Sequence, residues 1–209
     1  MIRLWGFRYS VYTWIARMAL AERGLAYDWS EVNPFDPEAE NPHPFGRVPL
    51  LDHDGARIFE TAAITTYLDE AFPGDSWTPD APLSRSRVTQ VIGMVDSYGY
   101  WPMVRDVFGP AVFAPATGRA PDQERIDGGL RDSLPVLDAL EEIAAEGVVL
   151  NGALTRADLH LAPMVGYFAA HPPAAELLGE RPCLSAWFSQ IRQRPSYLDT
   201  QPGLPENSL

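Results

Sequence analysis

A proline inside an apolar strand pattern is the feature that most restricts how this chain can fold. Val48, Leu50 and Leu51 form the short apolar run that a buried strand requires. Pro49 interrupts that run, and proline lacks the backbone N–H that a strand ladder needs, so it is confined to sheet edges, bulges and strand starts. A cis Val48-Pro49 bond is one physical resolution, because it lets the backbone of Val48 face outward and pair with an extended ligand.

The residues that follow predict a hairpin and then a helix. The sequence His-Asp-Gly-Ala at 53–56 supplies a turn with glycine where a positive φ is needed, and a second strand begins at Ile58. Apolar residues at helical spacing then predict a helix over about 61–72. The first turn of this helix carries the Thr61 hydroxyl and free backbone N–H groups, which together make a ready binding site for an anion.

The chain before the proline predicts a strand, a helix and a second strand. We expect a strand at Ile2–Gly6, a helix at 11–23 and a strand at about 26–32. A crossover of this length joins neighbouring parallel strands, so these two strands should pair in parallel. Residues 34–44 are rich in Pro, Asn and Asp, and we expect them to form an irregular loop that covers a ligand.

No strand pattern of comparable quality returns after residue 83, and apolar periodicity predicts helices instead. The first of these helices is long, and Pro102 should kink or interrupt it because proline clashes with the preceding helical turn. Thr155 and Asp158 are placed to cap a later helix as a variant capping box, which is a structural role. Helices are expected at about residues 84–108, 126–140, 155–168 and 182–194.

The segment between the two halves is the best candidate for a domain boundary. Pro73-Gly74-Asp75 ends the last helix of the first half, and prolines recur in the residues that follow. We therefore expect an α/β domain over residues 1–74, a linker over 75–83 and an all-helical domain over 84–209.

Composition limits the partners that such a protein can have. The formal net charge of −12 argues against nucleic acid or an anionic membrane surface. The sequence has no run of about 18 apolar residues and no signal-peptide pattern at its start, so we expect a cytoplasmic protein. The single cysteine, Cys183, rules out an internal disulfide and a paired-cysteine redox motif. The four histidines lack metal-ligand spacing, and no metal is expected.

The order Val-Pro-Leu, hairpin, Glu-Thr, helix resembles the glutathione-binding half of the thioredoxin-like domain in the glutathione S-transferase family. In that family the residue before a cis-proline pairs with the cysteinyl backbone of glutathione, and an acidic–hydroxyl pair binds its γ-glutamyl end. The resemblance therefore implies the first role for Val48 and Pro49 and the second for Glu60 and Thr61. It also implies that Arg47 lies near the glycyl carboxylate. A packing unit of an unrelated α/β domain is the alternative interpretation.

The second half extends this resemblance. Family members carry a hydroxyl-x-x-Asp cap on the central helix of an all-helical domain, which Thr155 and Asp158 match, and the tail at Arg194-Pro195 is similar to the last core helix of the family. The resemblance covers about residues 2–197. It implies a thioredoxin-like domain followed by an all-helical domain, and a homodimer.

A glutathione transferase needs a hydrogen-bond donor beside the thiol sulfur, because the thiolate is the nucleophile and a free thiol has a pKa near ~8.5. The resemblance places Ser10 on the serine of the serine-type classes, although Val11 replaces the proline that is common there, so no class is assigned. Tyr9 and Tyr12 are rivals, because a loop can move either phenol toward the sulfur. A plain N-cap role for Ser10, without catalysis, is a further alternative.

An aromatic cluster on the long helix is the expected wall for a small hydrophobic electrophile. The candidates are Tyr98, Trp101 and Phe108, with simple core packing as the alternative role. The resemblance thus implies a detoxification enzyme that uses glutathione as co-substrate, without a metal. A glutathione-dependent isomerase or peroxidase, and a non-catalytic transferase-like binding protein, remain as alternative functions.

Overall fold

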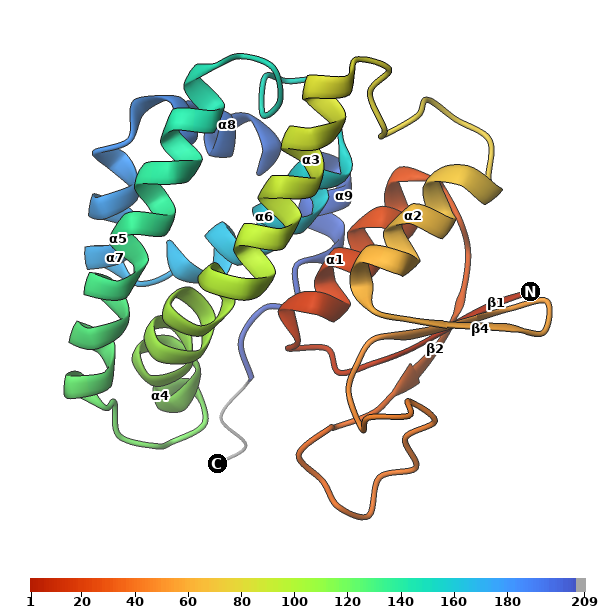
Figure 1. Cartoon of the computed structure of the whole chain (residues 1–209). Coiled ribbons are helices and arrows are strands. Elements are labelled where there is room, and N and C mark those ends of the chain that lie inside the picture. The colour runs from red at the N-terminus through yellow and green to blue at the C-terminus, as the bar shows by residue number, and fades with distance from the viewer. Residues whose placement is uncertain (206–209) are drawn as a thin grey trace.

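A four-stranded mixed sheet with two helices forms one side of the molecule, and a bundle of helices forms the other (Figure 1). The computed structural model describes residues 1–205. In chain order the first side contains β1 (Ile2–Gly6), α1 (Val11–Glu22), β2 (Asp28–Glu31), β3 (Leu50–His53), β4 (Ala56–Phe59) and α2 (Thr61–Ala71). The second contains α3 (Pro82–Met94), η1 (Val95–Phe113), α4 (Ala114–Ala116), α5 (Gln123–Ala145), α6 (Arg156–Phe168), α7 (Pro172–Gly179), α8 (Pro182–Ile191) and α9 (Pro195–Thr200).

The sheet has the strand order β2-β1-β3-β4. β1 and β2 pair in parallel, as the crossover predicts, while β1 with β3 and β3 with β4 are antiparallel. The hairpin turn places Asp54 and Gly55 at positive φ, which confirms the expected need for glycine there. β2 is shorter than expected.

The Val48-Pro49 bond is cis, as the sequence suggested. β3 begins at Leu50, so Pro49 precedes the ladder and its missing N–H costs the sheet no hydrogen bond.

The long helix differs from the expectation at Pro102. The chain continues through this residue and through Pro110 as a π-helix, η1, which starts at Val95 and is followed directly by α4. In a π-helix each N–H reaches the carbonyl five residues back, so the wider turn eases the clash that proline makes with the carbonyl four residues back. Gly129 of α5 allows close packing here, because a Cβ at that position would lie 2.8 Å from the carbonyl oxygen of Pro102.

One apolar core runs through both sides of the molecule. It includes Trp14 and Leu68 from the first side and Val91, Leu161 and Phe168 from the second. α1 and α2 therefore serve as a shared layer between the sheet and the helical bundle. Within the described residues, none of the helices has the length and apolarity that a membrane span requires.

The expected capping box at the start of α6 is confirmed, since the Thr155 N–H donates to Asp158 Oδ2 at 2.7 Å. Trp187 donates to the other oxygen of Asp158 at 2.7 Å, so the buried carboxylate has partners on both sides.

A second carboxylate caps α8: Glu141 accepts from the backbone N–H groups of Cys183 and Leu184 at 3.0 and 2.8 Å. Burial and the neighbouring Glu141 raise the pKa of the Cys183 thiol.

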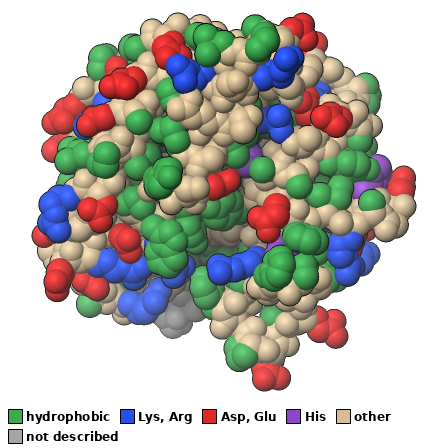
Figure 2. Space-filling model, viewed as in Figure 1, with side chains coloured by type: hydrophobic (Ala, Val, Ile, Leu, Met, Phe, Trp, Pro, Cys, Tyr) green, Lys and Arg blue, Asp and Glu red, His purple; other side chains and the backbone are tan. Residues whose placement is uncertain are grey.

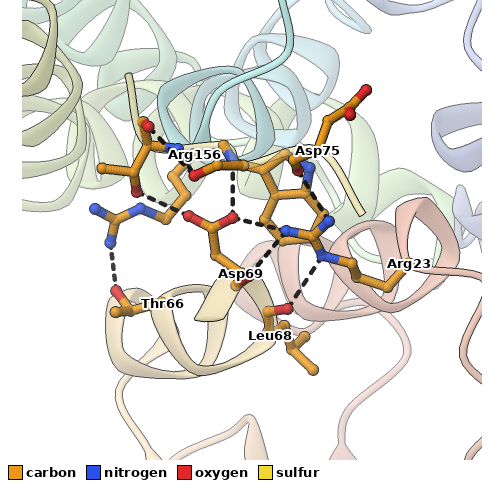
Figure 3. Close-up of polar contacts among 9 residues, drawn as sticks. Arg23, Thr66, Leu68, Asp69, Asp75 and Arg156 are labelled. Carbon is orange, nitrogen blue, oxygen red and sulfur yellow. Dashed lines mark hydrogen bonds and ion pairs between the residues drawn. The ribbon is translucent and has the colours of Figure 1, made fainter. Parts of the chain in front are cut away.

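A buried ion pair joins the far ends of α1 and α2 (Figure 3). Arg23 and Asp69, with side chains only 3% and 2% exposed, meet at 2.6 Å. The guanidinium also donates to the carbonyl oxygens of Leu68 and Asp75 and lies 3.9 Å from the ring centre of Trp77. The Trp77 carbonyl in turn accepts from the N–H of Arg156 at the start of α6, so four segments meet at one charge pair.

Replacement of Asp69 by asparagine should lower the free energy of unfolding by about 3–5 kcal/mol, because Arg23 keeps its charge in the interior without a counter-charge. Urea denaturation measures the change. The matched control is Asp28→Asn, which breaks an exposed pair with Arg3 at 3.8 Å and should leave stability close to that of the native chain. Equal stability of the two variants would contradict the role assigned to the buried pair.

Candidate functional site

A half-buried serine lies at the N-terminus of α1. Ser10 is the N-cap residue, and its Oγ accepts from the N–H of Thr13 at 3.3 Å. The expected N-cap role is thus present. It uses a lone pair of the hydroxyl and leaves the proton free to donate elsewhere, because a hydroxyl is both a donor and an acceptor. The positive end of the helix dipole lies at the same point.

The two tyrosines that flank this serine lie in different surroundings. Tyr9 packs edge-on against Phe7 and Phe113, with ring centres 5.4 Å apart in each case. Tyr12 points toward η1, where its ring lies 5.1 Å from Tyr100. Burial, together with the carboxylate of Asp96, raises the pKa of Tyr12 well above its ordinary value. Tyr12 therefore stays a neutral phenol, which can donate a hydrogen bond but does not supply an ionised oxygen.

A partly buried acid on η1 faces the same region. Burial raises the pKa of Asp96 from 3.8 to about 6; the hydrogen bond from Tyr12 opposes the rise and the charge of Glu60 adds to it. Oδ1 of Asp96 is buried and has no hydrogen-bond partner in residues 1–205. Two carboxylates, from η1 and from the start of α2, thus bring negative charge to one place, an arrangement that suits a cationic group of a ligand.

The start of α2 and the cis-proline turn form the opposite part of the site. Glu60 has φ +68° and precedes the first residue of the helix, and its side chain is exposed. A positive φ is uncommon for a residue other than glycine and often marks functional positions. Thr61 is buried, and no side chain caps the first N–H groups of α2. Val48, the residue before the cis-proline, is half-buried. Leu50 pairs with Phe59, so the proline turn lies next to the start of α2.

The loop before β3 contributes a buried histidine. His43 lies 5.2 Å from the ring of Phe59, and its Nδ1 accepts from the N–H of Phe45 at 3.1 Å. Burial lowers the pKa of His43, which is close enough to Glu60 and Arg47 for both charges to affect it. Arg47 itself is exposed.

The three aromatic residues proposed for the electrophile are not brought together. Tyr98 and Trp101 are 68% and 57% exposed, whereas Phe108 is buried and stacks on Tyr167 with ring centres 3.9 Å apart. Figure 2 shows a hollow between the sheet side and the helical side, with hydrophobic side chains gathered along its helical wall and acidic side chains at its margin.

Comparison with known proteins identifies the family that has this architecture. Residues 4–76 match the N-terminal domain of glutathione S-transferases, and residues 100–195 match their C-terminal domain. The chain belongs to the glutathione S-transferase family. The resemblance inferred from the sequence is thereby confirmed, as is the fold of a thioredoxin-like domain followed by a helical domain.

Individual members of this family align over nearly the whole chain. Glutathione S-transferase F13 of Arabidopsis thaliana is 28% identical over 195 residues, covering 90% of this chain and 89% of that protein. The crystal structure of glutathione transferase F7 from Populus trichocarpa is 27% identical with a TM-score of 0.79, over 96% of this chain and 97% of the other. Glutathione S-transferase I, solved with lactoylglutathione bound, is 25% identical with a TM-score of 0.81, over 96% and 98%.

Sequence reasoning did not single out Asp96 and His43, which the structure brings near Glu60 in the candidate site. The only sequence signal for Asp96 was an isolated acid next to Val95 on a predicted helix, and an acid at such a position is usually exposed to solvent. The only signal for His43 was its place in the loop before the cis-proline. Within the described residues, no group of three or more His, Cys, Asp or Glu side chains is arranged to hold a metal ion.

Asp96→Asn should stabilise the transferase at high pH and not at low pH. Because the folded-state pKa of about 6 lies above the ordinary 3.8, Asp96 favours the folded state at low pH, and this contribution is lost as the pH rises through about 6. The carboxyl is only partly buried, so we expect the variant to melt about 2–4 °C higher at pH 8, the shift for roughly 1 kcal/mol. The difference should vanish near pH 4. Differential scanning calorimetry measures both, and Asp132→Asn, at an exposed position on α5, is the control. A gain of equal size at both pH values would contradict the titration of Asp96.

Proposed function

We propose that this enzyme is a glutathione transferase in which Ser10 activates the glutathione thiol for attack on a small hydrophobic electrophile. One observation carries the proposal: the Ser10 hydroxyl is fixed by its bond from the Thr13 N–H, at the positive end of α1, with its proton unused. A hydroxyl held in this way donates to a thiolate without reorganisation, which is the condition for stabilising a developing charge.

The required stabilisation is of the size that this arrangement can supply. Lowering a thiol pKa of ~8.5 by about two units corresponds to roughly 2.7 kcal/mol in favour of the thiolate. A hydrogen bond to an ionised group contributes about 1.5–3 kcal/mol, and a helix N-terminus adds about 0.3–1 kcal/mol. Proximity of the bound electrophile contributes further to the rate.

We propose that glutathione lies between the cis-proline turn and the start of α2. Its cysteinyl backbone pairs with Val48 beside Pro49, and its γ-glutamyl end binds Glu60 and Thr61. The uncapped N–H groups of α2 suit the γ-glutamyl carboxylate, while the charges of Glu60 and Asp96 suit its ammonium group. Arg47, which is exposed on the loop before the turn, is available for the glycyl carboxylate.

We also propose a cytoplasmic homodimer with the domain division at 1–74, 75–83 and 84–209. The exposed apolar side chains of Phe45 and Tyr98, at 70% and 68%, provide surface that a second copy would cover. Light scattering after size-exclusion chromatography measures the mass of the assembly.

Two experiments separate this function from its alternatives. Retention on immobilised glutathione distinguishes a glutathione-dependent enzyme from a non-catalytic transferase-like protein. Turnover with a panel of electrophiles, hydroperoxides and isomerisable substrates then distinguishes transfer from peroxidase or isomerase activity. Absence of retention would contradict the proposal.

Ser10→Ala should raise the pKa of the enzyme-bound thiol by up to about two units, toward the ~8.5 of a free thiol. The ultraviolet absorbance of the thiolate, followed against pH with glutathione bound, measures this value. Loss of the N-cap should cost about 0.5–2 kcal/mol of stability as well, so denaturation is measured in parallel. Ser10→Thr is the matched control, because it keeps both the cap and the donor. An unchanged thiol pKa in Ser10→Ala would exclude the role of Ser10.

The affinity for the ammonium group should depend on the ionisation of Asp96. The dissociation constant for S-methylglutathione, which has no titrating thiol, should rise several-fold as the pH falls from 7 to 5, because Asp96 is protonated below about 6. The other ionisable groups that face this place are Glu60 and Tyr12, with His43 beside Glu60. Isothermal titration calorimetry should show a flatter profile for Asp96→Asn. The same pH dependence in the variant would assign the effect to another group.

A further inference from the structure

Aromatic side chains, joined by one arginine, form a circuit of contacts whose two ends, Tyr9 and Tyr12, flank Ser10 at the start of α1. The contacts run from the loop after β1, across the loop after β2, to η1 and back to α1, with successive centres 5.1–6.2 Å apart. Arg105 bridges Phe35 and Trp101, so that the circuit is continuous. We call these residues the aromatic belt: Tyr9, Phe7, Phe35, Trp101, Tyr100 and Tyr12.

The aromatic belt begins and ends on either side of Ser10. Tyr9 precedes this residue by one position and Tyr12 follows it by two, and both belong to the circuit. A group that reacts at the Ser10 hydroxyl therefore has aromatic residues of this belt on both sides of the serine in the sequence. Each step of the circuit is close to the separation that paired aromatic rings prefer, so a ligand with a flat ring can take part in the same packing.

Arg105 contributes the positive charge of the aromatic belt. Its guanidinium lies 5.7 Å from the ring centres of Phe35 and Trp101, which belong to opposite sides of the groove. Within residues 1–205 Arg105 forms no ion pair with a carboxylate, and the neighbouring Asp106 is already engaged by Arg125 at 2.7 Å. Glu31, the last residue of β2, is engaged by Arg8. A guanidinium stacked on rings keeps its in-plane N–H groups available for a planar anion.

The two sides of Ser10 thus differ in charge. Glu60 and Asp96 lie where the proposed function places the ammonium of glutathione, whereas Arg105 stacks on Phe35, which in turn packs against Phe7 in the loop before Ser10. We propose that the enzyme prefers aromatic electrophiles that carry an anionic substituent, such as a carboxylate, with the ring held by the aromatic belt and the anion bound by Arg105. This inference rests on the proposed function and names the substrate class for the same site.

The reaction that tests this preference is aromatic substitution on two matched acceptors, 4-chloro-3-nitrobenzoate and the neutral 4-chloro-3-nitrobenzamide. The thiolate sulfur forms a bond to the carbon that bears chlorine, chloride leaves with the bonding electron pair, and the thiol proton passes to solvent. The acceptors have the same shape and differ in charge. Each acceptor is compared with itself across enzyme variants, so its intrinsic reactivity cancels.

Arg105→Gln should lower kcat/KM for the benzoate about 10-fold and for the benzamide less than about 2-fold. Arg105→Lys keeps the charge but loses the planar fork, so the benzoate should fall by an intermediate factor. Arg131→Gln, at an exposed position on α5, is the control for the loss of one positive charge and should change neither value. Urea denaturation of each variant checks that the fold is intact.

Equal losses for the two acceptors in Arg105→Gln, or no loss for either, would overturn the proposal. If the native enzyme turned over neither acceptor, binding would test the charge preference, and the electrophile panel described above would test the transferase function. Quenching of tryptophan fluorescence reports such binding, because Trp101 lies against Arg105. In that case tighter binding of the benzoate than of the benzamide, lost in Arg105→Gln, would support the proposal, and equal binding would overturn it.

Discussion

The buried pair of Arg23 and Asp69 is the contact on which the rest of the structure depends. It fixes the end of α1 to the end of α2, and through Trp77 it fixes both to the start of α6. The opposite ends of the same two helices carry Ser10 and Thr61. The two halves of the candidate site are therefore set by helices that are joined at their far ends, where a charge pair out of water tolerates little displacement.

Local patterns predicted the part of the fold that lies close together in the sequence. The hairpin at 53–56, the parallel crossover and the capping box of Thr155 and Asp158 follow from turn chemistry, chain length and side-chain spacing, and the structure has each of them. The cis bond at Pro49 is one of the resolutions that the sequence allowed for a proline in a strand pattern. These features are determined by neighbours within a few residues.

Long-range features escaped the sequence for the same reason. Arg23 and Asp69 are 46 positions apart, and nothing in either stretch indicates that the two will meet in the interior. Asp96 looks like an ordinary helix-surface acid until Tyr12 and Glu60 are brought beside it. The path of η1 through Pro102 depends on packing against α5 at Gly129. The roles of Ser10, Val48 and Glu60 remain predictions, because they concern a ligand and not the fold.

Basic charge in this protein comes from arginine alone, since all 16 basic residues are arginines. Arginine stacks on aromatic faces, binds planar anions and stays protonated, as the positions of Arg23 and Arg105 illustrate. The absence of lysine also leaves the chain without side-chain amines.

The surroundings of Cys183 affect how readily an electrophile can alkylate the enzyme itself. Electrophiles alkylate thiolates most readily, and this thiol is held largely protonated because burial and Glu141 raise its pKa. Glu141 is also committed to capping α8, so the carboxylate that suppresses the thiolate is fixed by the backbone. The chain therefore offers reactive compounds one largely protonated thiol and no side-chain amine, so alkylation of the enzyme itself is disfavoured.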